Sequence, residues 1–139
     1  MKHAIIPSII SWLVGIVAMM VIGYLTMPKN YYTSEPTRDF FLALRFYAFY
    51  LGIVIFPACF ALAPSLKRHL PAAGDRKILV ATRSSALAGL LVMLFLELFV
   101  PFMPRIWSSG GFLCFGAAAL VGASFGFSYA ILYRQTPNA

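Results

Sequence analysis

Four long apolar stretches, with few polar residues between them, dominate this 139-residue sequence. The uncharged runs cover residues 4–28, 46–66, 84–96 (resuming after Glu97 as far as residue 104) and 106–133. A helix that crosses the hydrocarbon layer of a bilayer needs about 20 mostly apolar residues. The sequence therefore predicts an all-α polytopic membrane protein, a four-transmembrane-helix bundle. We expect its spans at about 5–27, 40–62, 83–103 and 111–133.

From the composition, we expect no room within these residues for a soluble catalytic domain. Hydrophobic residues make up 61% of the chain and charged residues only 11%, whereas an average soluble domain has about 25% charged residues. Four spans with short connections fill residues 1–139, which we treat as one membrane domain. The first run is longer than a signal-peptide core of about 7–15 residues, so we expect a retained span.

Lysine and arginine are distributed unequally between the two sides that alternating spans define. The connection at about 63–82, extended to Arg83, lies on the side of both chain ends. The basic residues on that side are Lys2, Lys67, Arg68, Arg76, Lys77, Arg83 and Arg134, against Lys29, Arg38 and Arg105 on the other. The positive-inside rule therefore predicts cytoplasmic termini, N-in and C-in. The compact chain is also expected in a bacterial inner (plasma) membrane.

The basic connection is a candidate binding surface. Lys67, Arg68, Arg76 and Lys77 are expected to contact anionic lipid headgroups or an acidic partner. Their role in setting topology accounts for such a loop without any binding function. The net charge of +7 does not favour nucleic acid as a partner, because no folded domain or aromatic-basic module accompanies it.

Small residues recur at every fourth position of the last span. The stripe consists of Cys114, Ala118, Gly122, Gly126 and Ala130. Small side chains on one face let another helix backbone approach closely, so this face is expected to pack against a helix. Its partner is either within the chain, for example the faces of Ser11 and Gly15 or of Ala48 and Gly52, or in another subunit.

Two ionisable residues, Arg45 and Glu97, fall inside predicted spans. Both lie about 7 Å below the same expected outer boundary, so they are predicted to form an ion pair between the second and third helices. Alternatively, each side chain reaches the outer headgroups separately. Ionisable groups within a membrane are the first place to look for a function in transport.

Aromatic residues crowd the beginning of the second helix, at 40–50, and Tyr31, Tyr32 and Trp107 join them near the predicted outer surface. This pattern is typical of an interfacial aromatic belt, and the alternative is a surface for a pigment, a quinone or an acyl chain. The helix is expected to start as an outward extension, with cap candidates at 33–36. We expect Pro57 to kink it near 52–53.

Prolines and turn-forming residues predict where the helices end. Pro28 marks the end of the first helix, residues 63–64 the end of the second, and Pro101 with Pro104 the end of the third. Residues 72–75 are predicted to form a turn, and residues 108–111 lead into the fourth helix.

No cofactor or metal site is expected. The sequence has no Cys-x-x-Cys motif, and Cys59 and Cys114 are predicted to differ in depth by about 20 Å, too far for a disulfide. His3 and His69 fall outside the spans, which argues against an intramembrane bis-histidine haem.

These features predict a non-enzymatic small integral-membrane subunit or assembly factor of a larger complex. It is expected to bind membrane lipids and other integral-membrane subunits through its small-residue and aromatic faces, with a homo-oligomer as second choice. The alternative is a small oligomeric transporter or channel that uses Arg45 and Glu97. An intramembrane enzyme acting on lipid is weaker, because no nucleophile–base pair is visible.

Overall fold

The computed structural model describes residues 2–26, 36–99 and 108–134, and these residues are all helical apart from short turns. The elements are α1 (Lys2–Thr26), α2 (Pro36–His69), the 3-10 helix η2 (Pro71–Arg76), α3 (Lys77–Phe99) and α4 (Ser109–Arg134). Each of the four α-helices is long and apolar enough to cross a membrane. The all-helical fold with four such helices is therefore confirmed, and it points to a multi-pass membrane protein.

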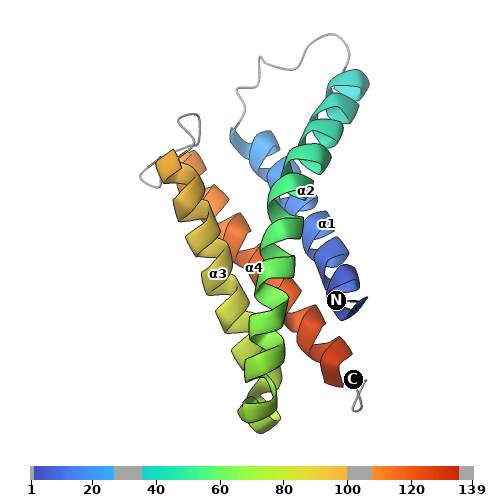
Figure 1. Ribbon diagram of the computed structural model, residues 1–139. Helices are drawn as coiled ribbons and strands as arrows, with labels where there is room; N and C mark the ends of the chain where they lie inside the picture. Colours follow the sequence, from blue (N-terminus) through green and yellow to red (C-terminus); the bar gives the residue numbers. More distant parts are fainter. Residues whose placement is uncertain (1, 27–35, 100–107, 135–139) are drawn as a thin grey trace.

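Successive helices run in opposite directions. As a result, the start of α1, the end of α4 and η2 lie at one end of the molecule (Figure 1). We call this the basic end, because Lys67, Arg68, Arg76 and Arg83 are exposed there. The opposite end, where α2 begins and α3 finishes, is the open end.

The helices pack in the spatial order α2, α1, α4, α3. The most extensive contacts are between α3 and α4, followed by those of α1 with α4 and with α2. The direct contact between α2 and α3 is small, and the two helices diverge toward the open end (Figure 1). The bundle is therefore open on the side between α2 and α3.

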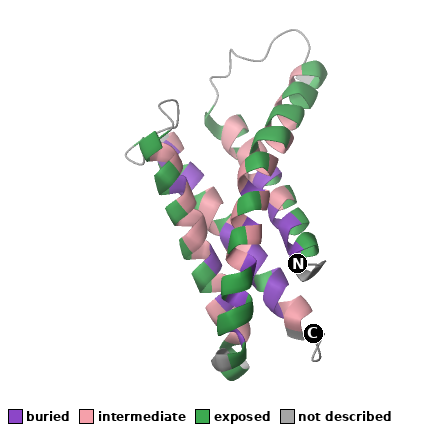
Figure 2. Ribbon diagram, viewed as in Figure 1, coloured by how far each residue is buried: buried purple, intermediate pink, exposed green. Residues whose placement is uncertain are grey.

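Most of the core lies toward the basic end, where all four helices contribute. This cluster includes Ala4 of α1, Leu66 of α2, Ala81 of α3 and Phe125 of α4. A second, smaller cluster contains Met93, Cys114 and Phe115, with Met19 of α1 packed against it, and none of its residues comes from α2. As a result, the open-end half of α2 is largely exposed (Figure 2).

The second helix is longer than the sequence pattern predicts. α2 continues through Pro64 to His69, so it does not end at 63–64, and much of the predicted loop at 63–82 is helical. A proline removes one helical hydrogen bond, but Ala63, Leu66 and Leu70 are buried against the other helices. Burying these side chains outweighs the lost bond and keeps the segment helical.

The turn predicted at 72–75 falls within η2. Gly74 has a φ of 52°, a conformation that side chains rarely adopt and glycine accepts at little cost. About midway along α2 the helix changes direction (Figure 1), in the region where Pro57 is expected to cause a kink.

The ends of the other helices are close to their predicted positions. The amide of Gly111 donates a hydrogen bond to Ser108 Oγ at 3.0 Å, so Ser108 caps the first turn of α4. α3 ends at Phe99. The predicted signals at Pro28, 33–35, Pro101 and Pro104, together with Tyr31, Tyr32 and Trp107, lie outside the described residues.

Candidate functional site

The small-residue stripe of α4 packs against α3. A Cβ atom built on Gly122 would overlap the backbone carbonyl of Ser85, and one on Gly126 would overlap that of Ala81. Gly89 of α3 meets the carbonyl of Ala118 in the same way. Backbone atoms of the two helices are thus in direct contact, as small side chains permit.

The partner stripe on α3 was not predicted from the sequence. Ala81, Ser85 and Gly89 are also spaced by four residues, and they face the α4 stripe. This four-residue spacing was the signal in the sequence that could have identified the stripe, although the large residues between these positions make it hard to recognise. Cys114, Gly122, Gly126 and Ala130 are buried and Ala118 is half-buried, so the stripe is occupied within the chain.

Of the two partner faces considered from the sequence, that of Ser11 and Gly15 packs on α4, and that of Ala48 and Gly52 packs on Trp12 of α1. Ser124 Oγ of α4 donates a hydrogen bond to Ser11 Oγ at 3.2 Å, which ties α4 to α1. The indole Nε1 of Trp12 donates to the carbonyl of Ala48 at 2.8 Å, which ties α1 to α2. These contacts are internal and assemble the scaffold.

Apolar side chains cover an exposed face of the open-end half of α2. We call it the aromatic face and define it by the exposed residues Phe41, Leu42, Arg45, Phe46, Phe49, Tyr50 and Ile53. The rings of Phe46 and Tyr50, one turn apart, have centroids 4.3 Å apart. The opposite face of α2 rests on α1, where Tyr47 lies over Gly23.

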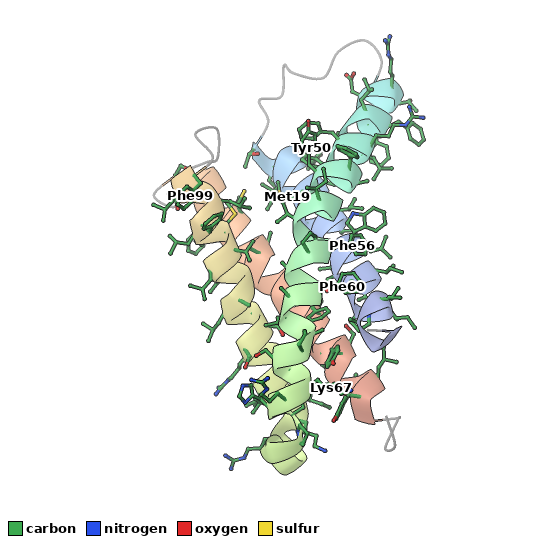
Figure 3. All side chains as sticks on the ribbon, viewed as in Figure 1. Met19, Tyr50, Phe56, Phe60, Lys67 and Phe99 are labelled. Atoms are coloured by element: carbon green, nitrogen blue, oxygen red, sulfur yellow. The ribbon has the colours of Figure 1, made fainter. Side chains whose placement is uncertain are left out.

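Arg45 is exposed in the middle of the aromatic face, whereas Glu97 is half-buried near the end of α3. The open-end half of α2 packs on α1 and diverges from α3, so the structure does not bring these two residues together. Figure 3 labels Tyr50 of α2 and Phe99 of α3, which lie on these diverging parts of the two helices and are well apart. Within the described residues of one chain, Arg45 and Glu97 therefore do not share a site.

The basic residues named from the sequence lie around η2. Lys67 and Arg68 are exposed on the last turn of α2, Arg76 is exposed at the end of η2, and Lys77 is half-buried at the start of α3. A shallow groove on α3 is lined by Arg76, Ile78, Leu79, Thr82 and Arg83. Arg83 was predicted from the sequence to contribute to the charge balance and was not among the expected contact residues.

The cysteines are free and lie in different clusters. Cys59 belongs to the core near the basic end, and Cys114 belongs to the smaller cluster. Within the described residues, no group of three or more His, Cys, Asp and Glu residues is positioned to hold a metal ion.

Comparisons with protein-family models, curated proteins and solved structures find no match.

Proposed function

We propose that this chain is a non-enzymatic subunit of a larger integral-membrane assembly and that it contacts a partner subunit through the aromatic face of α2. The observation that carries this proposal is the exposure of that face along the open-end half of the helix. Phe46 is 55% exposed and Phe49 is 65% exposed, although the same helix is packed on α1 along its other side.

The length of α2 distinguishes the aromatic face from an ordinary lipid-facing surface, because the helix is longer than the hydrocarbon layer is thick. At about 1.5 Å per residue, its 34 residues extend about 51 Å, well beyond the roughly 30 Å of hydrocarbon. The uncharged segment 46–66 alone matches the hydrocarbon thickness, with Arg45 and Lys67 at its two ends. This register leaves Pro36–Leu44 beyond the hydrocarbon at the open end.

That extension carries exposed apolar side chains. Phe40, Phe41 and Leu42 are each more than half exposed. Apolar surface left in water costs about 25 cal/mol per Å² relative to burial, and contiguous exposed patches mark interaction sites. An aromatic belt in the headgroup layer is the competing explanation for this surface. A partner subunit accounts in addition for the continuation of the same face into the hydrocarbon layer.

Arg45 supplies a polar contact in the middle of this apolar face. A guanidinium at the hydrocarbon boundary needs acceptors, and it offers five N–H donors in a planar arrangement. A carboxylate or free backbone carbonyl on the partner satisfies them and fixes the register of the two proteins. We therefore propose a partner that presents such an acceptor next to an apolar helix face.

We further propose that the basic end is cytoplasmic and that the membrane is a bacterial inner membrane. The exposed cations of the basic end support this orientation through the positive-inside rule. A cysteine introduced at His69, which is exposed at the end of α2, should react with a membrane-impermeant maleimide only after the membrane is opened. Reaction in intact cells would reverse the orientation.

Site-specific crosslinking tests the docking surface. A photoreactive benzoylphenylalanine is placed at Phe46 or Phe49 in the tagged full chain, and at Leu91 of α3 as the matched control. Leu91 is 66% exposed, like Phe49, but lies on another helix. The expected result is one stoichiometric protein adduct from α2 and none from Leu91, with adduct yield reduced at least fivefold by Arg45→Glu.

The mass of the adduct identifies the kind of partner. An adduct with twice the 15.3 kDa chain mass would identify the partner as a second copy of this chain, which would mean a homo-oligomer and not a hetero-complex. The proposal would be overturned if the chain were recovered from native membranes without any protein adduct and with equal amounts of lipid adduct at all three positions.

A further inference from the structure

The groove on α3 at the basic end combines two cations with an apolar lining. Arg76 at the end of η2 and Arg83 on the second turn of α3 line it, with Ile78, Leu79 and Thr82. Both arginines are exposed, and the lining residues that the structure describes include no acidic side chain.

The donors in this groove suit a phosphate oxyanion. Each guanidinium presents planar N–H donors that match two oxygens of one phosphate, and it carries no acceptor. The hydroxyl of Thr82 donates to the carbonyl of Ile78 at 2.8 Å, so its oxygen is available to accept a hydrogen bond from a ligand hydroxyl. A phosphodiester that bears a hydroxylated headgroup complements both features.

An exposed apolar track continues from the groove along α3. Leu87, Leu91, Leu94 and Leu98 are exposed, and at about 100° per residue they share one face of α3 with Arg83, whereas Arg76 lies just before this helix, in η2. The opposite face of α3 is packed against α4 through Ala81, Ser85 and Gly89. A ligand with a charged head and a long hydrocarbon tail fits this order of surfaces.

We infer that this groove binds the headgroup of an anionic phospholipid, with Arg76 and Arg83 holding the phosphate and an acyl chain lying along Leu87 and Leu94. Charge complementarity and the apolar track identify the ligand as a membrane lipid. The site does not depend on the partner subunit proposed above, because it lies on another helix at the other end of the molecule.

Lipid retention by the purified full chain tests this inference. The protein in detergent is titrated with phosphatidylglycerol or phosphatidylcholine, and bound lipids are counted by native mass spectrometry. The double variant Arg76→Gln/Arg83→Gln should bind phosphatidylglycerol about 10- to 30-fold more weakly, as expected for two basic groups near a lipid surface. Binding of phosphatidylcholine should not change.

A matched variant separates a defined site from general attraction to the basic end. Lys67→Gln/Arg68→Gln removes the same charge from the same end but leaves the groove lining intact. It should weaken phosphatidylglycerol binding less than threefold. Equal losses in the two double variants, or no loss in Arg76→Gln/Arg83→Gln, would overturn the inference. All four side chains are on the surface, and circular dichroism verifies the fold.

Two further arms identify the ligand. Inorganic phosphate at 10 mM should leave phosphatidylglycerol retention unchanged, because it lacks the acyl chain; full displacement would assign the groove to a free anion instead. Leu87→Asp places a carboxylate on the acyl track and should reduce retention at least fivefold, whereas unchanged retention would contradict the position of the chain.

Discussion

The backbone carbonyl oxygen of Ser85 occupies the position that a Cβ atom on Gly122 would need. This contact brings the backbones of α3 and α4 together without intervening side chains, and it is repeated at Gly126 and Gly89. Because membrane helices associate through close packing, where water supplies no hydrophobic drive, the α3–α4 pair should be sensitive to a single added methyl group.

Gly122→Ala should lower the free energy of unfolding by about 1–3 kcal/mol, because the helices must separate to accommodate the methyl group. Unfolding in mixed dodecyl maltoside–SDS micelles, followed by circular dichroism, measures the change. Gly116→Ala is the matched control, since Gly116 lies on the same helix with no atom within 4 Å of its built Cβ. Equal destabilisation by both substitutions would contradict the contact.

Ser85→Ala should have the opposite effect on the free energy of unfolding. The Oγ atom of Ser85 is buried without a hydrogen-bond partner in the described structure, and such a group costs about 1–3 kcal/mol. Removing it should raise the free energy of unfolding by about 1 kcal/mol in the same assay. Ser128→Ala should instead be destabilising, because the buried hydroxyl of Ser128 donates to the carbonyl of Ser124. A loss of stability in Ser85→Ala would show that its hydroxyl is satisfied.

Trp12→Phe tests the attachment of α2 to α1. The substitution removes the hydrogen bond from Nε1 to the carbonyl of Ala48 and should cost about 0.5–1.5 kcal/mol. Leu13→Ala is the control, because Leu13 is the next residue along α1 and is half exposed. An unchanged free energy of unfolding in Trp12→Phe, with Leu13→Ala measured alongside, would mean that the indole bond is not formed.

Arg45 and Glu97 should behave independently. Since α2 and α3 diverge between them, the effects of Arg45→Ala and Glu97→Ala on unfolding should add to within about 0.5 kcal/mol in a double-mutant cycle. A coupling well above that value would establish the ion pair that their predicted depth suggests.

The four helices could be predicted because each needs only a long apolar run, which is a local property of the sequence. The close-packing stripe of α4 was equally visible. Its partner was not, because small residues show that some helix approaches and not which one; Ala81, Ser85 and Gly89 are identified only when α3 and α4 are placed together.

Two other predictions depended on information that the sequence lacks. The end of α2 was placed at 63–64 from the local effect of Pro64, whereas burial of Leu66 and Leu70 by distant residues keeps the helix going. For Arg45 and Glu97, the sequence predicts a similar depth in the membrane, but it gives no lateral position for the helices that carry them. Depth follows from counting residues along each helix, but which helices become neighbours depends on the packing of the whole bundle.

The unequal support of the four helices has a consequence for assembly. Toward the open end, α2 has α1 as its neighbour, while α1, α3 and α4 share the smaller cluster around Met93. A helix anchored on one side gives up few contacts when it tilts. In the assembly proposed above, association through α2 would therefore adjust the angle of that helix while the remaining three keep their arrangement, and the bundle would not have to come apart first.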